Sequence, residues 1–141
     1  MSGKSDFFSH QRYALVGDSR DKKFPHFTHK YLMEQGKTVY PVDLSGGQAG
    51  FLGSLAEVPE DAEAVIIEVA KEKTAGTVSE ALDRGFKRIW LHQMTDTPEA
   101  LQLAAAAGAA VESGGCAVMY LAPTLSPHAL HRGIWKLVGR Y

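Results

Sequence analysis

Three times along this chain a helical pattern ends at a glycine and a short apolar segment follows at once. The glycines are Gly36, Gly85 and Gly108. A residue without a Cβ atom adopts the left-handed conformation at the end of a helix at the least cost, so each glycine marks the end of a helix. The chain is therefore predicted to repeat a helix–strand unit with short connections.

The apolar segments are predicted to be strands that are covered on both faces. They do not alternate between apolar and polar residues, which is typical of parallel sheets. The predicted strands cover residues 13–17, 38–43, 64–69, 88–93 and 109–113.

Helices are predicted between these strands. The first covers residues 25–35, with Phe27, Tyr31 and Leu32 toward the sheet, and the second covers residues 75–84. Thr97 is expected to cap the third, with Pro98 in its first turn. Strands that alternate with helices of this length predict an α/β fold. It is expected to be Rossmann-like and three-layered, with a mainly parallel sheet of about five strands.

Two other segments depart from the repeat. Residues 45–53 contain three glycines and are expected to form a flexible loop in place of a crossover helix, followed by one helical turn over residues 54–57. After a short apolar piece at residues 118–121, Ser126 is expected to cap a last helix. The apolar face of that helix could close the core or form a homodimer contact.

Length and charge limit the class of protein. With 141 residues, the chain fits one domain, expected over residues 13–141 behind a flexible N-terminus at residues 1–12. A net charge of −1 argues against binding to nucleic acid or to an anionic membrane. Cys116 is the only cysteine, and neither a signal peptide nor a membrane-spanning run is found, so a cytoplasmic location is expected.

The loop after the first predicted strand carries the residues best suited to bind phosphate. Gly17, Ser19 and three cationic side chains, those of Arg20, Lys22 and Lys23, precede the first helix. The N-terminus of a helix favours phosphate oxygens through its free N–H groups and its dipole. A tight turn that needs glycine explains the same residues, and the chain contains neither a dinucleotide fingerprint nor a P-loop.

Several segments together resemble the small, stand-alone CoA-binding proteins. Their domain is similar to the CoA-binding domain of succinyl-CoA synthetase and of acyl-CoA synthetases. The resemblance covers residues 13–116. The matching segments are Val16-Gly17-Asp18-Ser19, Phe24-Pro25, Tyr31-Leu32-Met33-Glu34-Gln35-Gly36, Pro41-Val42-Asp43-Leu44, Ser54-Leu55-Ala56-Glu57-Val58-Pro59 and Trp90-Leu91-His92-Gln93.

The resemblance implies a module that binds coenzyme A or a short acyl-CoA in a non-catalytic or accessory role. The pyrophosphate would lie on residues 17–19, the adenosine near the end of the second strand, and the rest of the ligand beside the ends of the third and fourth strands. The candidate cofactor-binding residues are Gly17, Asp18, Ser19, Arg20, Lys22, Pro25, Val42, Asp43, Ala70, Lys71, His92, Gln93 and Cys116.

Other functions remain open from the residues alone. Asp43 stands where NAD-binding domains hold the ribose hydroxyls, so an NAD(P)-binding oxidoreductase or redox sensor is the main alternative. Asp43 could equally cap the turn that follows it. A pure interaction domain that has lost its ligand is a third hypothesis.

The remaining polar side chains are weaker evidence for a functional site. Lys71 and Lys73 could contact phosphate, but Glu68 and Glu72 beside them are more typical of a solvated surface. The histidine pairs 26/29 and 128/131 lack a third ligand at a supporting interval, so no metal site is expected. We find no catalytic motif, and catalysis is not predicted.

Overall fold

The computed structural model contains one sheet of five strands, and it describes residues 7–21, 24–46, 50–92 and 95–115. All adjacent strands are parallel, in the order β2-β1-β3-β4-β5. The strands are β1 (Arg12–Gly17), β2 (Thr38–Asp43), β3 (Ala64–Glu68), β4 (Arg88–His92) and β5 (Ala110–Gly115).

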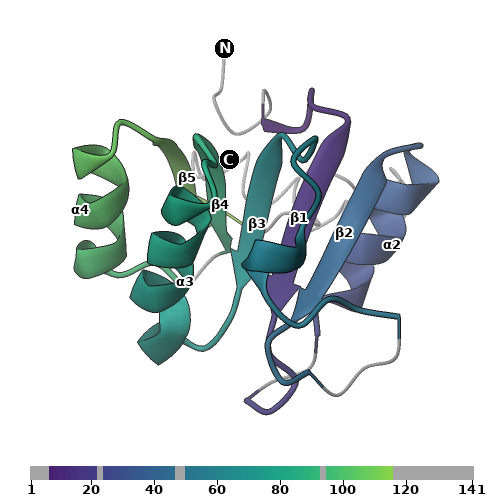
Figure 1. Ribbon diagram of the computed structural model, residues 1–141, viewed down its shortest axis with the longest axis horizontal. Coiled ribbons are helices and arrows are strands. Elements are labelled where there is room, and N and C mark those ends of the chain that lie inside the picture. The colour runs from purple at the N-terminus through teal and green to yellow at the C-terminus, as the bar shows by residue number, and fades with distance from the viewer. Residues whose placement is uncertain (1–6, 22–23, 47–49, 93–94, 116–141) are drawn as a thin grey trace, which may run out of the picture.

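Helices cover both faces of this sheet (Figure 1). Helix α2 (His26–Glu34) lies on one face, and helices α3 (Lys71–Asp83) and α4 (Pro98–Ala106) lie on the other. A single 3-10 turn, η1 (Leu55–Glu57), stands between β2 and β3 in place of a crossover helix. The predicted three-layer, Rossmann-like fold is confirmed, as is the helical turn before the third strand.

The sheet separates two hydrophobic cores. Successive strand residues point to opposite faces, so Tyr13 and Leu15 enter the core beneath α2, whereas Ala14 and Val16 enter the core beneath α3 and α4. All five residues of β3 are buried, as expected for a central strand covered on both sides.

The predicted helix ends are confirmed. Gly36, Gly85 and Gly108 have φ angles of 78°, 98° and 74°, the left-handed conformation that glycine adopts most readily. At the start of α4, Thr97 accepts a hydrogen bond from the backbone N–H of Ala100 at 3.1 Å. Pro98 occupies the first turn of that helix. Both predicted signals for the start of α4 are therefore confirmed.

The predicted buried face of α2 is wrong at one position. Tyr31 and Leu32 are buried as expected, but Phe27 is 56% exposed and Thr28 is buried in its place. The hydroxyl of Thr28 donates to the Glu68 carboxylate at 2.8 Å. A buried polar partner on β3 therefore sets the rotation of the helix, which an apolar pattern does not reveal.

Helix α3 begins one turn earlier than predicted, at Lys71. Its first turns place Thr74 and Thr77 on the buried face. The regular spacing of apolar residues does not indicate these positions, because threonine carries a polar hydroxyl. Both hydroxyls are satisfied, because Thr74 donates to the carbonyl of Thr95 at 2.7 Å and Thr77 donates to that of Lys73 at 2.8 Å. Lys71 and Lys73 consequently belong to a helix rather than a loop.

The free edge of β2 is partly covered by the loop that follows it. Leu52 forms a parallel bridge with Val42. The backbone N–H of Leu52 donates to the carbonyl of Pro41, and the N–H of Asp43 donates to the carbonyl of Leu52, both at 2.9 Å. This short bridge fixes the loop beside the carboxyl end of β2.

At the other end of the sheet, Phe7 and Phe8 pack against the core. Phe7 is fully buried, and its carbonyl accepts a hydrogen bond from the Tyr13 hydroxyl at 2.8 Å. The predicted piece at 118–121 and the last helix lie outside the described residues. None of the helices within the described ranges is long and apolar enough to cross a membrane.

Candidate functional site

The strand order creates a switch point between β1 and β3, because the chain leaves β1 toward one edge of the sheet and returns beside it at β3. Ligands of open parallel sheets bind at the carboxyl ends of the strands at such a point. The structure brings most predicted site residues to this edge: Gly17, Asp18, Ser19, Arg20, Pro25, Val42, Asp43, Ala70, Lys71 and His92. Lys22, Gln93 and Cys116 lie outside the described residues.

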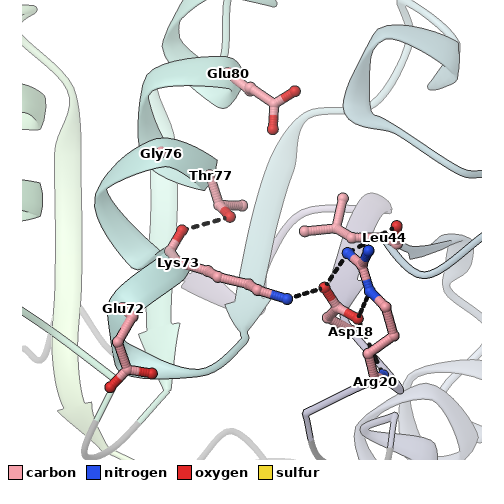
Figure 2. Close-up of a pocket in the computed structure, with 8 residues that line it drawn as sticks. All are labelled: Asp18, Arg20, Leu44, Glu72, Lys73, Gly76, Thr77 and Glu80. Atoms are coloured by element: carbon pink, nitrogen blue, oxygen red, sulfur yellow. Dashed lines mark hydrogen bonds and ion pairs between the residues drawn. The ribbon is translucent and has the colours of Figure 1, made fainter.

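An ion-pair cluster around the buried carboxylate of Asp18 joins the β1 loop to α3 (Figure 2). The Asp18 carboxylate, which is 1% exposed, accepts from the Arg20 guanidinium at 2.7 Å and from Lys73 Nζ at 2.6 Å. Lys73 also pairs with Asp21 at 2.6 Å. Two cations from different elements are thus held around one carboxylate.

The cluster shifts the titration of its members. Hydrogen bonds from Arg20, and then from Lys73, hold the pKa of Asp18 far below its ordinary value, against the opposing effect of burial. The same contacts raise the pKa of Lys73 and of Arg20. All three groups are therefore charged at neutral pH.

Asp43 has a structural role in the loops. It is fully buried, and its Oδ1 accepts from the backbone N–H groups of Ser19 and Ser45, each at 3.0 Å. Asp18 Oδ1 likewise accepts from the N–H of Arg20 at 3.1 Å. The N–H of Ser19, one of the backbone groups predicted to bind phosphate, is therefore satisfied by the chain itself, and so is the N–H of Arg20.

Gly17 is required by close packing. A Cβ atom at this position would lie 2.7 Å from Cδ of Pro25 and 2.9 Å from Cδ1 of Phe24. Because the ring of Pro25 begins α2 and Phe24 is buried, neither can move without shifting the helix.

Gly17→Ala is accordingly expected to lower the free energy of unfolding by about 1–3 kcal/mol, the usual cost of overpacking a core. Urea denaturation followed by circular dichroism measures this change. Gly53→Ala is the control, because its added Cβ would approach no atom closer than 3.4 Å. Equal stability of the two variants would show that the β1 loop adjusts freely.

The ion-pair cluster borders a pocket of about 380 Å³ between the β1 loop and α3 (Figure 2). Figure 2 shows Lys73 reaching across the pocket toward Asp18 and Arg20. The pocket is lined by Asp18, Arg20, Leu44, Glu72, Lys73, Gly76, Thr77 and Glu80.

Two helices begin at this edge without a side-chain cap. Neither Pro25 before α2 nor Ala70 before α3 caps its helix through a side chain, whereas Thr97 caps α4. The positive ends of α2 and α3 therefore flank the switch point with N–H groups that no capping side chain engages.

On the α2 face, the same edge holds a buried polar cluster that the sequence did not reveal. Glu68 is 8% exposed, so the expectation that it lies on a solvated surface is wrong. Its Oε2 accepts from Thr28, and its Oε1 lies 3.5 Å from Nδ1 of His92. Glu68 pairs with Gly17 in the sheet register, which places this carboxylate beside the β1 loop.

Aromatic side chains gather near the start of α2. The ring of Phe24 packs edge-on against Phe51 at 4.8 Å between centroids and against His29 at 6.3 Å. Burial, and then the neighbouring His26, lowers the pKa of His29. Within the described ranges, no three metal-ligating side chains come together, so this histidine pair has no third ligand there.

A family model for the CoA-binding domain matches residues 11–122, which include the whole of this edge. The chain belongs to the CoA-binding domain family. Family membership supports the binding of coenzyme A in general. The NAD(P) alternative gains no comparable support, because Asp43 is buried and bonded to the loop backbone.

Solved structures of other proteins share this fold. A hypothetical protein from Pyrococcus horikoshii is 26% identical, with a TM-score of 0.70 over 84% of this CoA-binding domain protein and 89% of its own chain. A conserved hypothetical protein from Pyrococcus furiosus is 26% identical, with a TM-score of 0.68. The match covers 77% of this chain and 97% of the other chain. Prb, a protein redesigned for binding, is 26% identical, with a TM-score of 0.71. The match covers 85% of this chain and 90% of the other chain.

Proposed function

We propose that this protein binds coenzyme A or a short acyl-CoA at the carboxyl ends of β1 and β3, as a non-catalytic or accessory module. The match of the CoA-binding family model over residues 11–122 carries the proposal. The pocket between the β1 loop and α3 supports it, because it lies at the switch point where such sheets bind ligands.

The pyrophosphate would bind between Arg20 and Lys73. The bonds that Arg20 makes to Asp18 and Leu44 use Nε and Nη2, so Nη1 is directed to no acceptor in the described part of the chain. The Lys73 side chain is 35% exposed and can turn one proton toward a phosphate oxygen. The uncapped starts of α2 and α3 add to the favourable potential.

The other parts of the ligand would lie at the carboxyl ends of the neighbouring strands. The adenosine would lie near Val42 and Asp43, at the end of β2, and the pantetheine arm near Ala70, Lys71 and His92. Fixed charges and hydrogen-bond donors of this kind bind phosphates without forming covalent bonds, which agrees with a role in binding rather than catalysis.

Isothermal titration of the ligand-free protein with CoA, and in parallel with NAD, tests the proposal. We expect heat from CoA alone. Lys73→Met is expected to raise the Kd for CoA at least about tenfold, because it removes a charge-assisted hydrogen bond to phosphate.

Lys87→Met is the matched control. Lys87 is exposed and directly precedes β4, so it lies at the amino ends of the strands, away from the proposed site. It should leave the affinity unchanged. Heat from NAD alone would favour the oxidoreductase hypothesis instead. No heat from either ligand would favour an interaction domain.

A further inference from the structure

The apolar core on the α2 face of the sheet ends in a charged pair. Ile66 on β3 and Trp90 on β4 point to this face and are fully buried. Glu68 and His92 stand two positions further along the same strands and point to the same face, because side chains alternate along a strand. Oε1 of Glu68 lies 3.5 Å from Nδ1 of His92, and the two side chains are 11% and 17% exposed. Two neighbouring strands therefore end in a carboxylate and an imidazole that lie side by side.

Packing alone does not explain this pair. Apolar side chains of similar volume often stabilise a fold as well as a buried ion pair does, because burial removes both charges from water. The preceding positions on this face of β3 and β4 are apolar, so the pair departs from the local pattern. Departures of this kind are typical of functional sites.

The carboxylate is held in place from α2. The hydroxyl of Thr28 donates to Oε2 of Glu68, so Oε1 is directed toward His92. A carboxylate beside Nδ1 favours the tautomer that carries its proton on that nitrogen, which makes Nε2 a proton acceptor. Nδ1 of His92 is buried although the side chain is 17% exposed, so other atoms of the side chain reach the surface. His92 is thus oriented to accept a proton from a group at the carboxyl ends of the strands.

The pair lies where the far end of the proposed ligand would arrive. Strand β4 is two strands away from β1, which is about 10 Å at the usual spacing of strands. The pyrophosphate would lie beside Lys73 of α3, on the opposite face of the sheet, so the sheet separates it from the charge of Glu68 (Figure 1). The pantetheine arm would cross the carboxyl ends of β3 and β4, and its terminal thiol would reach His92.

We propose that Glu68 and His92 form the site of the CoA thiol, and that the protein binds free CoA in preference to its thioesters. In this site the S–H bond breaks and its proton passes to Nε2 of His92, while the sulfur keeps the electron pair as a thiolate. The Glu68 carboxylate stabilises the resulting imidazolium. A thioester has no such proton and forms no such ion pair. The inference rests on the proposed function, because it assumes that CoA binds at these strand ends.

Titration with CoA, acetyl-CoA and desulfo-CoA tests the preference. CoA is expected to bind at least about tenfold more tightly than either of the others, because only CoA forms a charge-assisted contact with His92. Desulfo-CoA, in which a hydrogen atom replaces the thiol, is smaller than CoA. Its weaker binding could therefore not arise from a steric clash.

His92→Phe should abolish the preference. The variant keeps a ring at this position but has no proton acceptor, so its affinity for CoA should fall about tenfold, whereas its affinity for desulfo-CoA should change little. His10→Phe is the control, since Nδ1 of His10 also lies near a carboxylate, 3.9 Å from Oε2 of Glu63, and its side chain is 23% exposed. Because His10 precedes β1, at the amino ends of the strands, this variant should leave both affinities unchanged.

The transfer of the proton has its own readout, because a thiolate absorbs ultraviolet light where a thiol does not. The difference spectrum between the CoA complex and the desulfo-CoA complex at pH 7 should contain a thiolate band, although a free thiol is largely protonated at this pH. Glu68→Gln keeps an oxygen for Thr28 but removes the charge, so it should abolish the band. Glu34→Gln, at the exposed end of α2, should preserve it.

Three results would overturn the inference while leaving the proposed function intact: equal affinity for CoA and desulfo-CoA, tighter binding of acetyl-CoA than of CoA, or no thiolate band. If His92→Phe does not fold, the comparison of ligands with the wild type and the spectrum of Glu68→Gln still decide. Absence of binding by all three ligands would overturn the proposed function, and the inference with it.

Discussion

Replacing Asp43 with alanine is expected to lower the free energy of unfolding by about 2–4 kcal/mol, because two backbone donors lose their acceptor. The carboxylate is fully buried and accepts from the N–H groups of Ser19 and Ser45. Urea denaturation measures the loss of stability. Proton exchange at the same two amides should accelerate, because the loops after β1 and β2 are released together.

Asp43→Asn separates the hydrogen bonds from the charge. The asparagine retains a carbonyl oxygen at the position of Oδ1, so we expect it to preserve more than half of the stability lost in Asp43→Ala. If both variants are as stable as the wild type, Asp43 is not the residue that holds the two loops.

Replacing Asp18 with asparagine is expected to remove a large part of the acid sensitivity of the fold. The pKa of Asp18 in the folded chain lies far below its ordinary value, chiefly because of the hydrogen bonds from Arg20. A carboxyl group with a lowered pKa stabilises the fold above its unfolded pKa of about 3.9, and this contribution is lost as the pH falls through the folded value.

The measurement is the unfolding free energy of both proteins between pH 7 and pH 2. At pH 7 the variant should be less stable by about 1–2 kcal/mol, a modest figure because both cations are partly exposed to solvent. Below about pH 4 the difference should shrink, because the wild type loses the contribution that the variant never had. A constant difference across this range would show that Asp18 does not titrate with unfolding.

The local features of this chain could be predicted because single residues determine them. Gly85 ends α3 through its own φ angle, and Thr97 caps α4 through its own hydroxyl. The fold class follows from the order of such units, since parallel crossovers have one hand.

The site chemistry could not be predicted because it depends on pairs distant in sequence. Lys73 bonds to Asp18 across 55 positions, and Glu68 bonds to Thr28 across 40. Such pairs exist only because β3 lies beside β1, and the apolar pattern of a strand does not reveal its neighbour. The expected solvated position of Glu68 is wrong for this reason: Lys71 and Glu72, which follow it in the sequence, are exposed, whereas Glu68 is buried.

The bridge between Val42 and Leu52 has a consequence for self-association. A free sheet edge is a template on which another chain can add a strand and begin to aggregate. Here Pro41 has no N–H to offer, and its carbonyl, together with the N–H of Asp43, is already bonded to Leu52. The carboxyl half of β2, which lies beside the proposed ligand site, is thereby protected against the addition of a foreign strand.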